Sequence, residues 1–331
     1  LNISIIGGFI MEENNKKDLI FSLLFDEKGG ATNYGWEDID KWSPEKGTLW
    51  MHLSLSEDKI DNWVNKKSGL SKPFAKFLLD ERNRPRLLKE GDKFCLSLRA
   101  INFNVGEDPD DMVFLHIYME KNMIITIRHQ KVLAIDSIRT SLENNSGPKD
   151  SSEFLLQILT KISRKIGKVI QNIDDQVDDI EESVVEKADI KLRSSLSRLR
   201  RQAINLRRFL YPQREVLNYL GEIEISWFNP KAINQIRELI EKYIHYLEEI
   251  DSARDRAAIT HEEINSIYSE QLNQTMYVLS IVATIFLPLG FLTGLLGINV
   301  GGVPGTNNSQ AFLIVCIVLI LVGLIEFFIF K

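Results

Sequence analysis

Two uncharged apolar stretches near the C-terminal end limit what this chain can fold into. No charged residue occurs from Met276 to Leu296 or from Ala311 to Ile325. With its apolar flanks, each stretch has about the 20 residues that a helix needs to cross the hydrocarbon core of a bilayer. We therefore predict two transmembrane helices, at about 276–297 and 311–331, joined by a short Gly/Asn-rich loop at 298–310.

The charges around these spans predict their orientation. Two spans place both chain ends on the same side of the membrane. The loop contains no Lys or Arg, whereas Lys331 follows the second span, and positive residues favour the cytoplasmic side. Residues 1–10 are apolar, but they are too short for a signal peptide and lack a cleavage-site pattern. We expect cytoplasmic N- and C-termini, an external loop, and a place in the inner (plasma) membrane.

A very long helix is predicted ahead of the first span. Asn229-Pro230 suits a helix start, and no other Pro or Gly occurs before Pro288. Apolar residues recur at steps of three and four, as in a coiled-coil seam: Ile236, Ile240, Tyr243, Leu247, Ile250, Ala257 and Ile264. We predict one stalk and pore helix over 230–297, roughly 100 Å long at about 1.5 Å per residue.

Residues 1–150 are predicted to form a cytoplasmic α/β domain. Stretches with strand character begin near residues 21, 48, 93, 112 and 122, and they alternate with helical segments near 58–82 and 131–144. A mixed sheet fits this pattern. Asn144 to Lys149 has the composition of a linker.

Residues 151–229 are predicted to form a cytoplasmic helical hairpin. Ser151 or Ser152 is a suitable cap for the first helix, whose apolar stripe has helical spacing: Leu155, Leu159, Ile162, Ile166, Val169, Ile173, Val177 and Ile180. We expect Tyr211-Pro212 to interrupt the basic second helix, and Gly221 to close the segment that follows.

Composition argues against several classes of function. The net charge is −6 and the sequence pI is about 5.6, so nucleic acid is a poor candidate partner. Cys95 and Cys316 lie far apart, which disfavours a disulfide framework. We find no nucleophile–base constellation and no phosphate-binding glycine loop, so we predict neither an enzyme nor a bound cofactor.

One face of the first span carries small residues. Met276, Ala283 and Gly290 are spaced by seven, as are Ser280, Leu287 and Gly294. Asn273, then Ser269 or Ser266, and Glu262 continue this stripe toward the cytoplasm. Small residues allow close helix packing, and a polar continuation is typical of a wet vestibule. Packing and pore lining both remain open as explanations for the small residues.

Several acidic positions have two possible roles. Glu326, inside the second apolar stretch, is either a proton or ion ligand or a carboxylate that reaches the cytoplasmic interface. The cluster from Asp174 to Glu182 is either a metal sensor or the polar face of an amphipathic helix. Glu262 and Glu270 could concentrate cations if several copies came together. The five histidines, at positions 52, 116, 129, 245 and 261, show no paired ligand spacing for zinc.

The segment from Thr284 to Gly305 resembles the CorA superfamily of divalent-cation channels and transporters. That superfamily ends its first span with Gly-Met-Asn, where this chain has Gly297-Ile298-Asn299. The Ile at the middle position and the following Gly-Gly-Val-Pro-Gly are similar to the zinc-associated ZntB branch. Residues 84–88, 98–104 and 111–113 also resemble that branch. One departure is Gly290, where the family commonly has a polar residue such as Thr, which leaves any ligand there in doubt.

The resemblance implies a funnel-shaped homopentamer with the tripeptide ring at the outer mouth. By motif position, the channel-facing residues would be Asn273, Met276, Leu279 or Ser280, Ala283, Leu287, Gly290 and Gly294. A ring of Asn299 amides and nearby backbone carbonyls would hold a hydrated cation without stripping its water. Its neutral groups would bind weakly enough to release the ion. The alternative account of Gly297 and Asn299 is an ordinary helix C-cap and turn, which the surrounding motif disfavours.

These observations predict transport of a divalent cation as cargo, with zinc favoured. Proton coupling remains open. A magnesium or broad divalent-cation channel on the same scaffold is the first alternative. A membrane-tethered scaffold or sensor, whose α/β domain binds a partner, is an alternative from another class. The expected partners are other copies of the chain, the lipid bilayer and metal ions.

Overall fold

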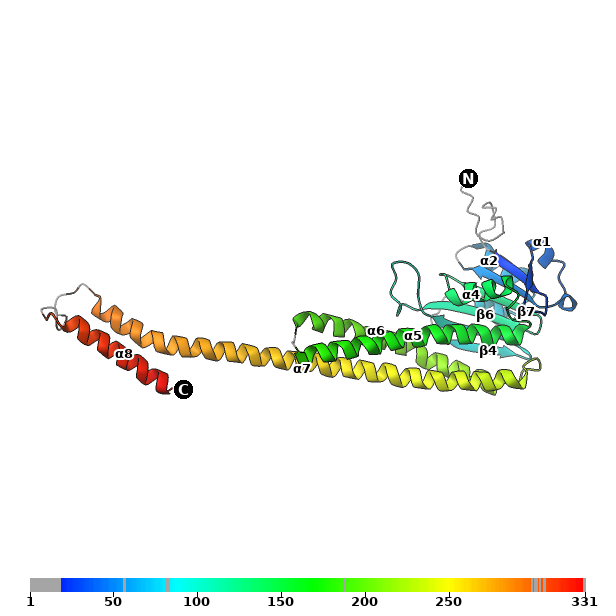
Figure 1. Cartoon of the computed structure of the whole chain (residues 1–331). Helices are drawn as coiled ribbons and strands as arrows, with labels where there is room; N and C mark the ends of the chain where they lie inside the picture. Colours follow the sequence, from blue (N-terminus) through cyan, green and yellow to red (C-terminus); the bar gives the residue numbers. More distant parts are fainter. Residues whose placement is uncertain are drawn as a thin grey trace.

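The structure is a computed structural model that describes residues 19–55, 58–80, 84–186, 189–298, 300, 303, 305 and 308–329. The predictions made for residues 1–10 and for Asn299 lie outside these residues. One long helix begins beside a sheet domain (Figure 1). At its far end it forms a hairpin with the last helix of the chain.

The sheet has seven strands in the order β2-β1-β3-β7-β6-β5-β4. The strands are β1 Leu19–Phe25, β2 Ala31–Asn33, β3 Leu49–Ser54, β4 Arg86–Glu90, β5 Lys93–Ala100, β6 Val113–Glu120 and β7 Met123–Arg128. The β3–β7 pair is parallel and the other pairs are antiparallel. The predicted mixed sheet is therefore confirmed. The short edge strands β2 and β4 were not predicted.

Alternating side chains give the sheet two buried faces. On β3, Met51 points into one apolar cluster and Trp50 into the other, as the period of two in a strand requires. The Met51 face packs against α2 Asp58–Lys66 and α3 Lys72–Leu78. The Trp50 face packs against α4 Leu133–Glu143 and α5 Ser151–Glu186. Two short helices, α1 Trp36–Ile39 and η1 Pro44–Lys46, lie between β2 and β3.

Three long helices pack side by side beneath the sheet: α5, α6 Ile190–Glu222 and α7 Pro230–Leu296 (Figure 1). The cap of α5 differs from the prediction. Oδ1 of Asp150 accepts the N–H of Glu153 at 2.8 Å, whereas the Ser151 hydroxyl donates to the carbonyl of Lys121. Asn229 caps α7 as expected at Asn229-Pro230, because its Oδ1 accepts from the N–H of Lys231 at 2.6 Å.

The predicted break at Pro212 is wrong, because α6 continues through it to Glu222. An internal proline costs a helix about 3 kcal/mol. On both sides of Pro212, α6 buries apolar side chains, among them Leu206, Leu210, Leu217 and Leu220. Burying one such side chain stabilises by about 1.5–3 kcal/mol, so packing outweighs the lost hydrogen bond.

The two most apolar helical segments form an antiparallel hairpin at the far end of α7 (Figure 1). The last part of α7 and α8 Ala311–Ile329 are long and apolar enough to cross a membrane, and neither apolar window is buried by the chain. The fold class predicted for this chain, an α/β domain with a long stalk and two spans, is confirmed.

Candidate functional site

The predicted channel-facing residues lie on one side of α7, in a part of the helix that the chain leaves mostly uncovered. All eight are exposed in the chain: Asn273, Met276, Leu279, Ser280, Ala283, Leu287, Gly290 and Gly294. A Cβ added to Gly290 or Gly294 would meet no atom within 4 Å. On another face of α7, Leu289 packs against α8, since a Cβ on Gly323 would lie 3.8 Å from its Cδ1. The stripe is thus free to meet another molecule.

The helix ends at Gly297, the first residue of the predicted ring. Its N–H donates to the carbonyls of Thr293 at 3.0 Å and Gly294 at 3.2 Å. Its φ of −87° and ψ of −1° are open to any residue, so conformation alone does not require glycine. A Cβ there would instead lie 3.1 Å from the carbonyl oxygen of Thr293. Ile298 is exposed, and the helix C-terminus supplies partial negative charge beside it.

The approach to the stripe from the cytoplasmic side is polar. Glu262 and Glu270 are both exposed on α7. Thr275 and Ser269 turn their hydroxyls back to carbonyls of their own helix, at 2.9 Å in each case. Among the described residues, no group of three or more His, Cys, Asp or Glu side chains is placed to hold a metal ion. One copy of the chain therefore brings Glu262 and Glu270 into no metal site.

The two buried histidines are structural parts of the sheet domain. Nδ1 of His52 lies 2.8 Å from the Thr126 hydroxyl, and burial lowers the pKa of His52 well below its usual range. Nε2 of His116 lies 3.0 Å from the carbonyl of Asp80, and burial lowers the pKa of His116 to about 4. His245 pairs with Glu249 at 3.1 Å on the exposed side of α7. His261 lies 3.4 Å from the Asn265 amide.

The acidic cluster of α5 surrounds an arginine from α7. Arg256 contacts Asp174 at 3.1 Å, Glu181 at 2.6 Å, and also Asp178. The guanidinium thus stands where the metal-sensor interpretation would place a cation, which favours the structural role for this cluster. This group of ion pairs was not predicted from the sequence. The signal was available, because positions 174, 178 and 181 share one helical face and Arg256 adjoins the seam of α7.

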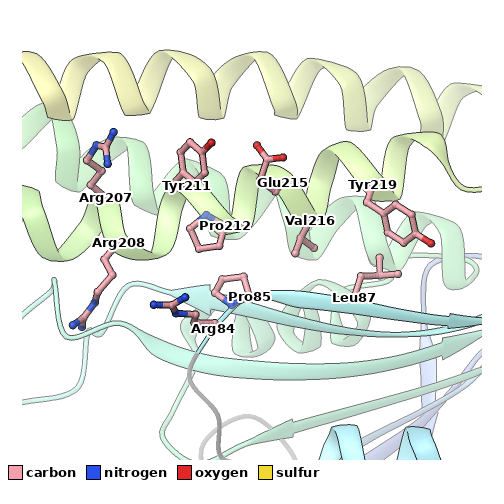
Figure 2. A pocket seen from close by; sticks show the side chains of 10 residues that line it. All are labelled: Arg84, Pro85, Leu87, Arg207, Arg208, Tyr211, Pro212, Glu215, Val216 and Tyr219. Atoms are coloured by element: carbon pink, nitrogen blue, oxygen red, sulfur yellow. The ribbon is translucent and has the colours of Figure 1, made fainter.

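A basic groove of about 570 Å³ separates α6 from the segment that leads into β4 (Figure 2). Pro212 and Val216 of α6 face Pro85 and Leu87 across it. Arg84, Arg207 and Arg208 also line the groove, and Arg207 pairs with Asp251 of α7 at 2.7 Å. The lining has three arginines and one carboxylate, Glu215, so its net positive charge makes this groove a poor place for a metal ion.

The chain resembles known cation transporters along almost its whole length. A family model described as a CorA-like Mg2+ transporter protein matches residues 45–331. The zinc transport protein ZntB of Yersinia enterocolitica is 32% identical over 307 residues, 93% of each chain. The divalent cation transporter CmaX of Pseudomonas aeruginosa is 32% identical over 326 residues, 97% of each chain.

Solved structures agree with these matches. The structure of full-length CmaX is 31% identical with a TM-score of 0.84, and the match covers 96% of this chain and 98% of that one. The CorA magnesium transporter of Methanocaldococcus jannaschii is 21% identical with a TM-score of 0.78, over 94% and 97% of the chains, which shows a shared fold. The family predicted from the membrane motif and the prediction that the chain is not an enzyme are confirmed. This chain belongs to the CorA-like family of divalent-cation transporters.

Proposed function

We propose that five copies of this chain form a central pore in the inner membrane and carry a divalent metal cation through it, with zinc favoured. The observation that carries this proposal is the uncovered stripe of eight residues on α7. One pair of spans cannot enclose a water-filled path. Several copies that turn this stripe inward can do so, and small residues such as Gly290 and Gly294 let the helices approach closely.

The tripeptide Gly297-Ile298-Asn299 would form the entrance ring of this pore. Five Asn299 amide oxygens, with backbone carbonyls near Gly297, offer neutral acceptors to a hydrated ion. The α7 helices end here, so their partial negative charges would add to the attraction for a cation. Neutral groups also release the ion readily, which conduction requires. Further along the path, rings of exposed Glu262 and Glu270 would raise the local cation concentration.

The choice of zinc follows the relatives, and the orientation follows the charges. ZntB of Yersinia enterocolitica is named a zinc transport protein, and CmaX a divalent cation transporter. The family description names Mg2+ instead, so a magnesium or broad divalent-cation channel is the second candidate. The antiparallel arrangement of α7 and α8 supports a topology with both chain ends on one side, and the positive-inside rule favours the cytoplasm as that side. Proton coupling of the transport is part of the proposal.

The test is radioactive zinc uptake into proteoliposomes by the full-length chain. We expect Asn299→Ala to lower uptake at least about tenfold, the equivalent of one lost contact of about 1.4 kcal/mol. Gln310→Ala is the matched control, because Gln310 has an exposed amide side chain in the same loop but outside the tripeptide. Magnesium uptake measured in parallel separates the two candidate cargoes.

The outcomes distinguish the parts of the proposal. Wild-type uptake of both metals at the level of empty liposomes would overturn transport and leave a scaffold or sensor. Equal zinc uptake by wild type and Asn299→Ala, well above background, would overturn the entrance ring alone. Light scattering of the detergent-solubilised protein tests the assembly, since five copies of the 38.0 kDa chain give about 190 kDa of protein.

A further inference from the structure

Glu326 is the one acidic residue of the described part of α8, and it turns toward α7 rather than away from it. It lines a pocket of about 910 Å³ together with residues of α7 that include Thr284 and Pro288. Its Oε2 atom is buried and has no hydrogen-bond partner. Thr284 and Pro288 belong to the uncharged stretch Met276–Leu296, so Glu326 lies beside the interior of the first span.

The described residues that line the pocket around Glu326 carry no counter-charge. Besides Thr284 and Pro288, it is lined by Phe286, Leu287, Gly290 and Phe291. In the described parts of the two spans, the other titratable side chains are Tyr277 and Cys316, and neither lines this pocket. An ionised carboxylate without a partner is costly in hydrocarbon, whereas the protonated acid is neutral. The carboxyl group of Glu326 therefore faces an apolar lining rather than a basic side chain.

The α7 side of the pocket presents a suitable acceptor for the protonated form. Pro288 has no N–H, so the carbonyl of Thr284, four residues earlier, lacks its regular helical donor. A protonated Glu326 carries an O–H that could donate to such a carbonyl, while the carboxylate has only acceptors. Gain of one proton would thus add a donor to the contact between α7 and α8, and its loss would leave two acceptors facing each other.

The pocket also adjoins the proposed ion path. Leu287 and Gly290 belong both to this pocket and to the uncovered stripe of α7. A change in the contact at Pro288 would therefore reach the face along which the cation moves. A proline within a helix is a common point of bending, which makes this level of α7 a suitable place for such a change.

We propose that Glu326 is the proton-binding residue of this transporter, and that its protonation state, sensed at the pocket beside Pro288, couples proton movement to metal transport. The inference rests on the proposed function and deepens it, because it names the residue that would carry the proton. The Glu326 carboxylate binds one proton from the more acidic side and releases it on the other side. Only the O–H bond of the acid forms and breaks.

The experiment uses full-length protein in proteoliposomes whose membrane voltage is held at zero by potassium and valinomycin. Radioactive zinc uptake is followed to its end point, with equal pH on both sides or with the outside one pH unit more acidic. If one proton enters with each zinc ion, the gradient should raise the final inside-to-outside zinc ratio about tenfold in wild type. In Glu326→Gln the gradient should leave this ratio unchanged.

Two further variants show whether the carboxyl group itself matters. Glu326→Asp keeps an acid and should keep the response to the gradient. Glu248→Gln removes an exposed carboxylate from the cytoplasmic part of α7 and should respond like wild type. Exchange of labelled for unlabelled zinc at equal pH needs no net proton movement. A Glu326→Gln variant that still exchanges zinc but ignores the gradient therefore has lost coupling rather than transport.

The outcomes separate this inference from the proposed function. A wild type that takes up no zinc overturns both. A wild type that takes up zinc without responding to the gradient, or a Glu326→Gln variant that responds like wild type, overturns the inference alone. If Glu326→Gln does not assemble, infrared difference spectra with and without zinc test wild type and Glu326→Asp instead. The inference would also be overturned if wild type showed no zinc-dependent band from a protonated carboxyl group, or if this band did not shift in Glu326→Asp.

Discussion

The side-chain amide of Gln213 takes the place of a strand residue at the edge of the sheet. β4 pairs with β5 only as far as Arg86 opposite Ser97. Two residues later, the main chain of Arg99 bonds instead to Gln213, whose Oε1 accepts the Arg99 N–H at 2.6 Å and whose Nε2 donates to the Arg99 carbonyl at 3.2 Å. The same Nε2 donates to the Tyr243 hydroxyl of α7 at 2.7 Å. One side chain of α6 thus joins the sheet to the helix that leads into the membrane.

Gln213→Leu should weaken this junction by about 3 kcal/mol. Gln213 and Arg99 are 1% and 5% exposed, so water has little access to the main-chain groups that lose their partner. An unsatisfied buried polar group costs about 1–3 kcal/mol, and two such groups are left on Arg99. Leucine fills a similar volume, so cavity formation adds little. Two groups at this cost give about 2–6 kcal/mol, and we take the lower half of that range because the neighbouring side chains can relax.

Hydrogen exchange of the full-length protein in detergent, read by mass spectrometry, measures this loss of local stability at Arg99 itself. Local opening that becomes easier by about 3 kcal/mol should speed exchange of the peptide containing Arg99 about 100-fold. Gln202→Leu is the control, since it makes the same substitution at a half-buried position of the same helix. If the Arg99 peptide exchanges alike in the two variants, the amide contributes no net stability and the reasoning is refuted.

Three other perturbations have defined outcomes. Arg256→Met leaves three carboxylates without their cation. Because the Arg256 side chain is 31% exposed, we expect a loss of only about 1–2 kcal/mol in unfolding free energy, and a smaller loss at high salt. Thermal unfolding of the full-length chain measures this loss. The pKa of His116 is about 4 in the fold and 6.5 ordinarily, so the unfolded chain binds this proton more readily. The contribution of His116 to stability should be complete above about pH 6.5 and be lost as the pH falls toward 4. His116→Gln should flatten the dependence of the unfolding free energy on pH between these values. Gly294→Leu places a large side chain in the stripe and should cut zinc uptake more than about tenfold, whereas Phe312→Leu on the exposed face of α8 should leave it near wild type.

The parts of the fold that sequence predicted are those with long or strictly periodic patterns. The uncharged stretches after Met276 and Ala311 and the capped start at Asn229 need no knowledge of distant neighbours. The five central strands alternate clearly, as Trp50 and Met51 illustrate. The run of α7 from Pro230 to Leu296 follows from the same local signals.

The parts that sequence missed depend on tertiary partners. β4 is a short edge strand that exists through its pairing with β5. Pro212 is tolerated because the residues around it are buried, which no local pattern at Tyr211-Pro212 reveals. Arg256 meets Asp174 and Glu181 across two helices. For the candidate site, the stripe on α7 was proposed from spacing, and its lining role remains a prediction, as does the role of Asn299.

The way α7 is supported gives a physical reason for the proposed assembly. Up to Ile264 the chain buries one side of α7 by itself, with Tyr243 and Ala257 among the covered residues. Beyond Ile264 no residue of α7 is fully buried, although Ile267 and Tyr268 still touch the core. The remaining helix to Leu296 is roughly 50 Å long at about 1.5 Å per residue. Lipid can cover its apolar sides, but Asn273 and Ser280 would be poorly accommodated in hydrocarbon, and the segment below the membrane has no lipid at all. Other copies of α7 that present the same stripe would cover both these polar residues and the segment below the membrane. The contacts of Arg256 and Gln213 would fix the angle at which each α7 leaves its own cytoplasmic domain.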